Sequence, residues 1–506
     1  MYFKNQKFFV AGLSKSGIAG AEFLLARGAA VYIYDDVADG AVLAAAEKLS
    51  ARGAVPVRAE ELAKAAAECD VLVLSPGIPI DHELPVAFRR AGKRIVGESE
   101  LGCLFLRAAL VAVTGTNGKT TTVTMIDEIL RAAGLNSIAC GNIGLPLAAC
   151  VDTLGYDDVA VMEVSSFQLE TLSSIRPHVA VVTNITEDHL NRHYSMENYI
   201  FLKSKILRNM RESEYAVLNF DDENVRSLAK DARCKVRWFS LRERAEGAYL
   251  FDGGLYFENE KIMDAADLSL KGEHNLKNAL AALCAAKLMG VESGVIAKAL
   301  SSMRGVRHRM ETVAEVNGVT YINDSKGTNV DATLNAIGCM QADTVLLLGG
   351  RDKGYDYDAL FQKIKDSRVV HAVLYGENRF KLLNAAARSN ETRITLCAGF
   401  EMAVKIAAMM AQPGQCVLLS PASSSFDELR SAGRGVRKDR QGTAGERRCR
   451  TVRSLRLSRR APPKSGSGAS SLCRFWSFWS RRSACSWSIP RVTTRRKSSS
   501  ATPSIS

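Results

Sequence analysis

VAVTGTNGKTTT, at residues 111–122, leads from an apolar strand through a glycine-bearing loop into the start of a helix. The backbone N–H groups of such a loop, at a helix N-terminus, bind polyphosphate. Lys119 is expected to neutralise the β- and γ-phosphates, and the Thr120 hydroxyl to bind Mg²⁺. The spacing is G-x-x-G-K-T, because Val113 stands where the general phosphate-loop pattern has its first glycine. The alternative is a tight turn with an incidental lysine, but the order strand, loop, helix favours phosphate binding.

Two segments rich in acidic residues follow this loop. MEVSSFQLE (162–170) places Glu163 at the end of an apolar strand, and TNITEDHLNRH (183–193) places His189 just after the next one. The carboxyl ends of parallel strands converge on one crevice, so Glu163 and His189 are expected to reach a metal beside the phosphates. The alternatives are a surface cap for Glu163 and a helix N-cap for the Glu-Asp-His run.

Two predicted helices carry unusual polar residues. SMENYIFLKSKILRNM (195–210) is predicted as one amphipathic helix with Lys203 among apolar neighbours, where a lysine normally extends to solvent. GEHNLKNALAAL (272–283) places Asn275 and Asn278 on one helical face. Capping explains one of these asparagines but hardly both.

Short apolar runs alternate with helical stretches in three successive blocks, which predicts an α/β chain with mostly parallel sheets. The runs are KFFVAGL (7–13), VYIYDD (31–36), VLVLSPGIP (71–79), LVAVTG (110–115), DVAVMEVSSF (158–167), HVAVVTNIT (178–186), GVTYINDSKGTN (318–329), DTVLLLGG (343–350), VVHAVLYG (369–376) and QCVLLSPASSS (415–425). Their grouping predicts three domains, at residues 1–105, 106–310 and 311–430, followed by a tail at 431–506.

The first block has a second phosphate-loop-like segment, VAGLSKSGIAG (10–20), with Asp35 and Asp36 at the end of the following strand. The glycines at 12, 17 and 20 do not form G-x-G-x-x-G, which disfavours NAD. A helix N-terminus facing a diphosphate and a packing turn without ligand are both compatible with the residues.

Composition excludes several classes of protein. The 506 residues are 47% apolar and 24% charged, which is ordinary for a globular protein of about three domains. The 12 cysteines form no C-x-x-C pair, no run of 18 apolar residues occurs, and the apolar N-terminal segment is too short for a signal peptide. These features predict a cytoplasmic protein with reduced thiols and no membrane segment.

The net charge of +13 is distributed unevenly. Residues 431–506 hold 19 of the 67 Lys and Arg residues but only two of the 54 acidic residues, so this tail carries +17 and the body −4. The body is therefore not expected to bind nucleic acid. The tail, with three of the four Trp residues among its arginines, leaves nucleic-acid binding as an alternative to a solvated disordered segment.

Together the motifs resemble those of the Mur ligase family over about residues 7–430. They are GTNGKTTT, GNIG (141–144), EVSSFQL, NITEDHL, YIFLK, HNLKN, RHRME, NDSKGTN, GGRDKG and LLSPASSSFD. GLSKSG and SPGIP (75–79) are more similar to the members that add D-glutamate than to those that add alanine, a diamino acid or a dipeptide.

The resemblance implies a Rossmann-like UDP-binding domain, a central ATPase domain with the phosphate loop, and a Rossmann-like C-terminal domain that closes over them. It implies ATP-driven amide formation through an acyl phosphate, with two Mg²⁺ ions, which adds D-glutamate to UDP-N-acetylmuramoyl-L-alanine in peptidoglycan precursor synthesis. The protein is expected to be a monomer. A sister ligase, a folate polyglutamylating enzyme and an inactive homologue are the alternatives.

The resemblance also implies residue roles. Lys203 matches a lysine that the family carries as a CO₂-derived carbamate, which would help to hold the second metal ion. The other implied metal-site residues are Thr120, Glu163 and His189. The catalytic residues implied are Lys119, Glu163, His189 and Lys203. ATP is expected to contact Gly115, Thr116, Asn117, Gly118, Lys119, Thr120, Thr121, Asn275, Asn278, Arg309 and Asp324. The UDP-linked substrate is expected at Ser14, Lys15, Ser16, Asp35, Asp36 and Asn142, and D-glutamate at Lys326, Thr328, Lys353 and Ser425.

The end of the chain departs from the family pattern. After LLSPASSSFDEL, family members continue into a helix with an aromatic residue and an E-x-R-G pattern, which residues 431–435 break. The aperiodic Arg- and Ser-rich sequence that follows is interpreted as a disordered tail or the product of a shifted reading frame. Resequencing the coding DNA tests the frameshift, since a single-base change must restore a family-like ending.

Overall fold

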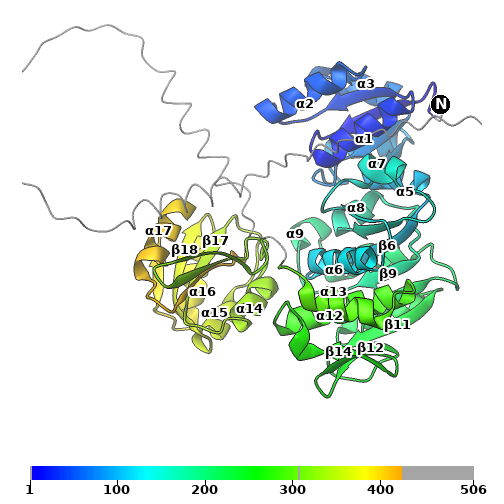
Figure 1. Cartoon of the computed structure of the whole chain (residues 1–506). Coiled ribbons are helices and arrows are strands. Elements are labelled where there is room, and N and C mark those ends of the chain that lie inside the picture. Colours follow the sequence, from blue (N-terminus) through cyan, green and yellow to red (C-terminus); the bar gives the residue numbers. More distant parts are fainter. Residues whose placement is uncertain (1–2, 306–307, 424–506) are drawn as a thin grey trace, which may run out of the picture.

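Three sheets with helices on both faces make up the chain in the computed structural model (Figure 1). The structure describes residues 3–305 and 308–423. Nearly all strand pairs are parallel, so the predicted α/β fold class is confirmed. The tail at 431–506 and Ser425 lie outside the described residues. Across the described ranges, no helix is long and apolar enough to cross a membrane, and the nine cysteines are free thiols.

The first sheet is wholly parallel, in the order β3-β2-β1-β4-β5. Its strands are β1 (Lys7–Ala11), β2 (Ala30–Tyr34), β3 (Val55–Pro56), β4 (Val71–Leu74) and β5 (Arg94–Val96). Its helices are α1 (Lys15–Ala26), α2 (Gly40–Ser50), α3 (Leu62–Glu68), α4 (Glu83–Arg90) and α5 (Glu98–Phe105). Helices α1, α2 and α5 cover one face, and α3 and α4 cover the other.

The central sheet has the order β14-β13-β12-β11-β10-β9-β6-β8-β7. Its strands are β6 (Ala109–Thr114), β7 (Ser137–Gly141), β8 (Val159–Glu163), β9 (Val179–Val182), β10 (Tyr215–Asn219), β11 (Lys235–Ser240), β12 (Gly247–Phe251), β13 (Gly254–Phe257) and β14 (Glu260–Asp264). The helices on one face are α6 (Lys119–Ala132), α12 (Glu273–Leu288) and α13 (Ser293–Ser302). The other face carries α7 (Leu147–Cys150), α8 (Ser166–Thr171), α10 (Met196–Ser204) and α11 (Glu223–Ser227).

Strand β6 lies inside this sheet between β8 and β9, and its residues are buried on both faces. That position explains the near-continuous apolar sequence before the phosphate loop. It also brings the carboxyl ends of β6, β8 and β9 to one edge.

The third sheet has the order β15-β16-β20-β17-β18-β19 and is parallel except for the β15–β16 hairpin. Its strands are β15 (Glu311–Val316), β16 (Val319–Asn323), β17 (Thr344–Gly350), β18 (Val369–Gly376), β19 (Ile394–Leu396) and β20 (Cys416–Leu419). Helices α14 (Val330–Gly338), α15 (Asp358–Lys365) and α16 (Arg379–Arg388) cover one face, and α17 (Phe400–Met410) covers the other.

Several local features differ from the sequence prediction. The predicted apolar runs do not include strands β3, β5, β7, β10, β11, β15 and β19. The helix predicted over 195–210 ends earlier, because α10 stops at Ser204 and a 3₁₀ turn follows at Lys205–Leu207. The antiparallel strands β12 to β14 were not predicted. An Asp-Gly pair at 252–253 joins β12 to β13, and this pair is a recognised hairpin signal.

Two buried acidic residues on α5 join the first domain to the second. Glu98 accepts hydrogen bonds from the Ala148 backbone N–H at 2.6 Å and from Ser99. Glu100 accepts from the backbone N–H groups of Ser173 at 2.7 Å and Ser174 at 2.9 Å. Burial raises the pKa of Glu98 to about 7. The contact between the domains therefore depends on a carboxyl group that titrates near neutrality.

Glu98→Gln is expected to remove a pH-dependent loss of stability. The pKa of about 7 in the folded protein exceeds the ordinary value of 4.5, so the native state holds an extra proton between these values. The stabilisation that the protonated Glu98 side chain contributes is fully present below the lower of the two pKa values. It is lost as the pH rises through the higher value, which lowers the free energy of unfolding by about 3 kcal/mol. Glutamine stays neutral and keeps an acceptor for the Ala148 N–H.

The check is the thermal unfolding midpoint of both proteins between about pH 5 and pH 8, the range set by the two pKa values. Glu60→Gln, at an exposed carboxylate, is the matched control. Parallel profiles for the wild type and Glu98→Gln would contradict the assignment.

Candidate active site

The phosphate loop follows β6 and is shaped by two glycines with positive φ, Gly115 at +148° and Gly118 at +82°. A Cβ on Gly115 would lie 1.9 Å from Thr183 Oγ1, and a Cβ on Gly118 would lie 2.2 Å from Asn278 Oδ1. Side chains are therefore excluded at both positions, and the backbone can approach a ligand closely. Gly118 is also the N-cap of α6, where unpaired N–H groups favour anions.

Residues after β9 hold the loop in place. The backbone N–H of Asn117 donates to Asn184 Oδ1 at 2.8 Å, and the Asn184 amide donates back to the Asn117 carbonyl at 3.0 Å. The Thr183 hydroxyl donates to the same carbonyl at 2.6 Å. Neither Thr183 nor Asn184 was predicted as a site residue. Both lie within the strand predicted at 178–186, whereas the observed β9 (Val179–Val182) ends just before them.

Lys119 folds back onto its own loop. Its ammonium group donates to the carbonyls of Gly115 at 2.9 Å and Thr116 at 2.7 Å. Burial lowers the pKa of Lys119, and the nearby Glu163 opposes that shift. The cation is thus held at the loop, where a phosphate group can take over from the carbonyls.

Glu163, predicted at a metal site, lies at the carboxyl end of β8 and is 2% exposed. Its Oε2 accepts from the Thr120 hydroxyl at 2.7 Å, and its Oε1 accepts from the Asn142 amide at 2.7 Å. The alternative interpretation as a surface cap is therefore wrong. The structure brings together two predicted metal-site residues and a predicted substrate residue.

Lys203 is 1% exposed, so the alternative in which it extends to solvent is wrong. Its ammonium group donates to the Gly115 carbonyl at 2.7 Å and lies 4.5 Å from the centre of the Tyr199 ring. Burial and the nearby Lys119 hold the pKa of Lys203 well below its ordinary value. A buried amine with a lowered pKa gives up its proton more readily than an exposed lysine does, which frees its lone pair.

His189 begins α9 (Leu190–His193) in the left-handed region, with φ of +57°. Burial lowers the pKa of His189 to about 4, although Asp188 opposes the shift. The imidazole is therefore neutral at physiological pH, which is the form that binds metals. It forms no side-chain cap bond, so the alternative helix-capping interpretation does not hold for His189.

Asp188 connects this edge to the third domain. It accepts hydrogen bonds from Tyr355 and from Asn329, and Lys353 Nζ lies 3.8 Å from its Oδ1. Burial would raise the pKa of Asp188, but Lys353 and the hydrogen bonds from Tyr355 and Asn329 hold it below the usual value. Tyr355 and Asn329 were missed, because no sequence spacing relates them to Asp188.

A cavity of about 640 Å³ lies between the loop, α12 and the third domain. Of the residues expected around ATP, it brings together Asn117, Gly118, Thr121, Asn275, Asn278, Arg309 and Asp324. The Nε atom of Arg309 is buried there without a hydrogen-bond partner among the described residues. Burial raises the pKa of Asp324 to about 6, despite hydrogen bonding from Ser420 and the nearby Arg309.

The side chains beside the phosphate loop suit Mg²⁺ better than a metal ion whose ligands all come from the protein. Over residues 3–305 and 308–423, no cluster of three or more His, Cys, Asp or Glu side chains forms. Mg²⁺ is typically held by one or two carboxylates together with waters and phosphate oxygens. The Thr120 hydroxyl and Glu163 carboxylate, beside the loop, are such a partial set.

Of the residues expected at the UDP-linked substrate, all but Asn142, which lies beside Glu163 in the second domain, gather at the carboxyl edge of the first sheet. Asp35 Oδ2 accepts from the Leu13 N–H at 2.6 Å, next to Ser14, Lys15 and Ser16 at the start of α1. Asp36 instead accepts from Tyr34 at 2.6 Å. A Cβ on Gly17 would lie 1.8 Å from the Gly12 carbonyl, which explains a glycine there.

Among residues expected at D-glutamate, Lys353 and Lys326 have different settings. Lys353 lies beside Asp188 and Tyr355, whereas Lys326 is exposed on the loop after β16. Thr328 follows on that loop, its backbone N–H bonded to the Lys326 carbonyl at 3.0 Å. Ser425 lies outside the described residues.

Comparison with known proteins gives three family matches along the chain. They are the Mur ligase MurD-like N-terminal domain at residues 6–97, the Mur ligase middle domain at 113–286, and the Mur ligase glutamate ligase domain at 308–423. The UDP-N-acetylmuramoylalanine–D-glutamate ligase of Pelotomaculum thermopropionicum is 43% identical over 441 residues, covering 85% of this chain and 95% of that protein.

Solved structures share the three-domain fold. The UDP-N-acetylmuramate–alanine ligase MurC of Thermotoga maritima aligns with a TM-score of 0.57 at 19% identity, over 87% of this chain and all of that one. MurF ligase from Thermotoga maritima, in complex with ADP, aligns with a TM-score of 0.52 at 17% identity, over 83% and 92% of the two chains.

Gly118→Ala is expected to weaken Mg–ADP binding by about a hundredfold, because a Cβ would collide with Asn278 and strain the loop backbone. Gly134→Ala is a matched control at the other end of α6, since its φ is +84° and no atom lies within 4 Å of a Cβ there. The control is expected to lower stability by about 1 kcal/mol and leave affinity unchanged. Titration calorimetry and thermal unfolding separate the two effects, and equal affinities in both variants would contradict this model of the loop.

Proposed function

The chain belongs to the Mur ligase family, and from that premise we propose that it joins D-glutamate to UDP-N-acetylmuramoyl-L-alanine with hydrolysis of ATP to ADP and phosphate. One observation carries the proposal. The phosphate loop, Glu163 and the buried Lys203 converge at a single sheet edge, next to a cavity that the third domain completes.

The reaction forms and breaks bonds in two steps. The alanine carboxylate oxygen attacks the γ-phosphorus of ATP, the bond to the ADP oxygen breaks, and an acyl phosphate forms. The amine of D-glutamate then attacks the acyl carbon, loses a proton and expels phosphate, which leaves the amide. Neither step requires covalent chemistry by the protein, so its residues act by positioning and by stabilising charge.

Lys119 would bind the β- and γ-phosphates in place of the carbonyls that it now contacts. Asn275, Asn278, Arg309 and Asp324 line the cavity where the adenine and ribose would lie. Asn142 bonds to Glu163, which supports a position for the reacting carboxylate between the first and second domains. Lys353, Lys326, Thr328 and Ser425 would bind the two carboxylates of D-glutamate.

Thr120, Glu163, His189 and Lys203 would hold two Mg²⁺ ions, with Lys203 as its carbamate. Bound Mg²⁺ would neutralise charge on the phosphoryl oxygens. The buried position and lowered pKa of Lys203 support carbamate formation, because an uncharged amine attacks CO₂. A monomeric state and a cytoplasmic location are also part of this proposal.

Phosphate release from Mg–ATP and UDP-N-acetylmuramoyl-L-alanine is expected only when D-glutamate is present. Lys119→Ala should lower kcat/KM by about a thousandfold, because it removes a preorganised charge at the phosphates. Lys48→Ala, at an exposed lysine on α2, is the control.

Phosphate release that depends on another amino acid would favour a sister ligase, and release with a folate substrate a folate polyglutamylating enzyme. No release with any amino acid would favour the inactive homologue.

Lys203→Ala is expected to lower kcat by about a thousandfold, because an anion that holds a metal is lost. Added acetate or formate should restore part of the activity by supplying a carboxylate to the vacated space. Lys205→Ala is the control, since Lys205 donates to the Leu169 carbonyl away from the loop. A ¹³C NMR signal from labelled CO₂ in the wild type, absent in Lys203→Ala, reports the carbamate directly. Full activity of Lys203→Ala would contradict the role.

A further inference from the structure

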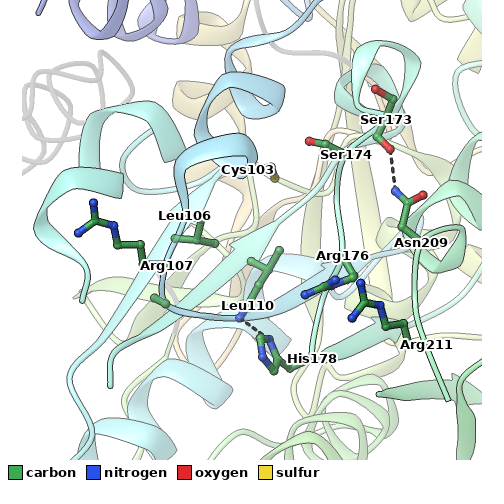
Figure 2. A pocket seen from close by; sticks show the side chains of 11 residues that line it. Cys103, Leu106, Arg107, Leu110, Ser173, Ser174, Arg176, His178, Asn209 and Arg211 are labelled. Carbon is green, nitrogen blue, oxygen red and sulfur yellow. Dashed lines mark hydrogen bonds between the residues drawn. The ribbon is translucent and has the colours of Figure 1, made fainter. Parts of the chain in front are cut away.

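A second cavity, of about 600 Å³, is shown in Figure 2. It lies at the opposite edge of the central sheet from the phosphate loop, which follows the carboxyl end of β6. Its lining residues lie at the amino ends of β6, β9 and β10, and all but Leu110, which is in β6, precede these strands. They are Cys103, Leu106, Arg107, Ala108, Leu110, Ser173, Ser174, Arg176, His178, Asn209 and Arg211. The cavity thus shares no residue with the proposed active site.

The lining is cationic. It contains three arginines, Arg107, Arg176 and Arg211, and no acidic residue. Glu214, just outside the lining, pairs with Arg176 at 3.3 Å and accepts from the Arg211 backbone N–H at 2.6 Å. Within the described residues, the Arg211 side chain forms no hydrogen bond or ion pair. Glu100, also just outside the lining, bonds to the backbone N–H groups of Ser173 and Ser174. Two carboxylates therefore lie beside three guanidinium groups, which leaves net positive charge for an anion.

Polar donors lie among the arginines. His178 Nδ1 accepts from the Leu110 backbone N–H at 3.2 Å, so the neutral ring carries its proton on Nε2 and can donate it. The Oγ atom of Ser174 is buried without a hydrogen-bond partner among the described residues. A buried hydroxyl without a partner is costly and gains from a ligand that accepts its proton.

The walls of the cavity are held in place without a ligand. Asn209 donates to the carbonyls of Ser173 at 2.6 Å and Ile175 at 3.0 Å, and Glu100 accepts from the backbone of Ser173 and Ser174. Figure 2 shows the bond from Asn209 to Ser173 beside the cavity. Binding there would not have to order a loop, which lowers its entropic cost.

The remaining lining is apolar, from Leu106, Ala108 and Leu110. The volume is within the range of small-molecule sites and exceeds what a single inorganic anion fills. We propose that this cavity binds a small organic phosphate. Its phosphate group lies against Arg176, Arg211 and His178, and its apolar part lies against Leu106 and Leu110.

Hydrogen–deuterium exchange on the full chain tests this, with Mg–ADP present in every sample so that the nucleotide cavity is occupied equally throughout. The probes are phenyl phosphate, inorganic phosphate as the free anion, and phenol as the ring without charge. Phenyl phosphate is expected to protect residues 107–110 and 174–178, and inorganic phosphate to protect them more weakly. Exchange at 115–122 reports ADP separately, so failure at one site is distinguishable from failure at the other.

Arg211→Ala is expected to weaken the binding of phenyl phosphate about tenfold or more, since one charged hydrogen bond is lost. Arg208→Ala is the matched control, because Arg208 is exposed and lies outside the cavity lining. The affinity of this variant for phenyl phosphate should change less than about twofold. The Arg211 side chain has no partner in residues 3–305 and 308–423, so its removal leaves Glu214 paired with Arg176. No protection by phenyl phosphate, equal protection by phenol, or unchanged binding in Arg211→Ala would overturn the proposal.

Discussion

The carbonyl oxygen of Gly115 accepts hydrogen bonds from two buried lysines, Lys119 at 2.9 Å and Lys203 at 2.7 Å. Burial lowers the pKa of both lysines, Lys119 lowers that of Lys203 further, and Glu163 and Asp188 oppose these shifts. The site therefore lacks negative charge, which a polyphosphate would supply. This arrangement depends on glycine at 115, because any Cβ there would collide with Thr183.

The surrounding fold places the remaining groups around that carbonyl. Parallel pairing of β6 with β8 and β9 brings Glu163 and the residues after β9 to the same edge. Asp188 then ties the third domain to this edge through Tyr355, Asn329 and Lys353. Because the body of the chain is mildly acidic, anionic ligands must be bound by a few placed cations and not by a general positive field.

Much of the site was predictable because it follows local rules. The phosphate loop was identified from its spacing, and Glu163 from its place at the end of an apolar strand. Asn329, Tyr355 and Asp331 were not identified. Asp331 accepts from the Asn117 amide at 2.7 Å, although 214 positions separate them in sequence. Such contacts arise only when the third domain lies against the second, and no local pattern encodes that placement.

The sequence by itself determined the α/β class and the family, since apolar runs and glycine-bearing turns are local signals. The tertiary structure decided whether the Lys203 side chain is buried or reaches solvent. Helical periodicity left it free to reach solvent, and only its packing against Tyr199 and the Gly115 carbonyl makes it a buried amine. The physical reason is desolvation, because the pKa of an amine depends on every group packed around it, whatever its distance along the chain.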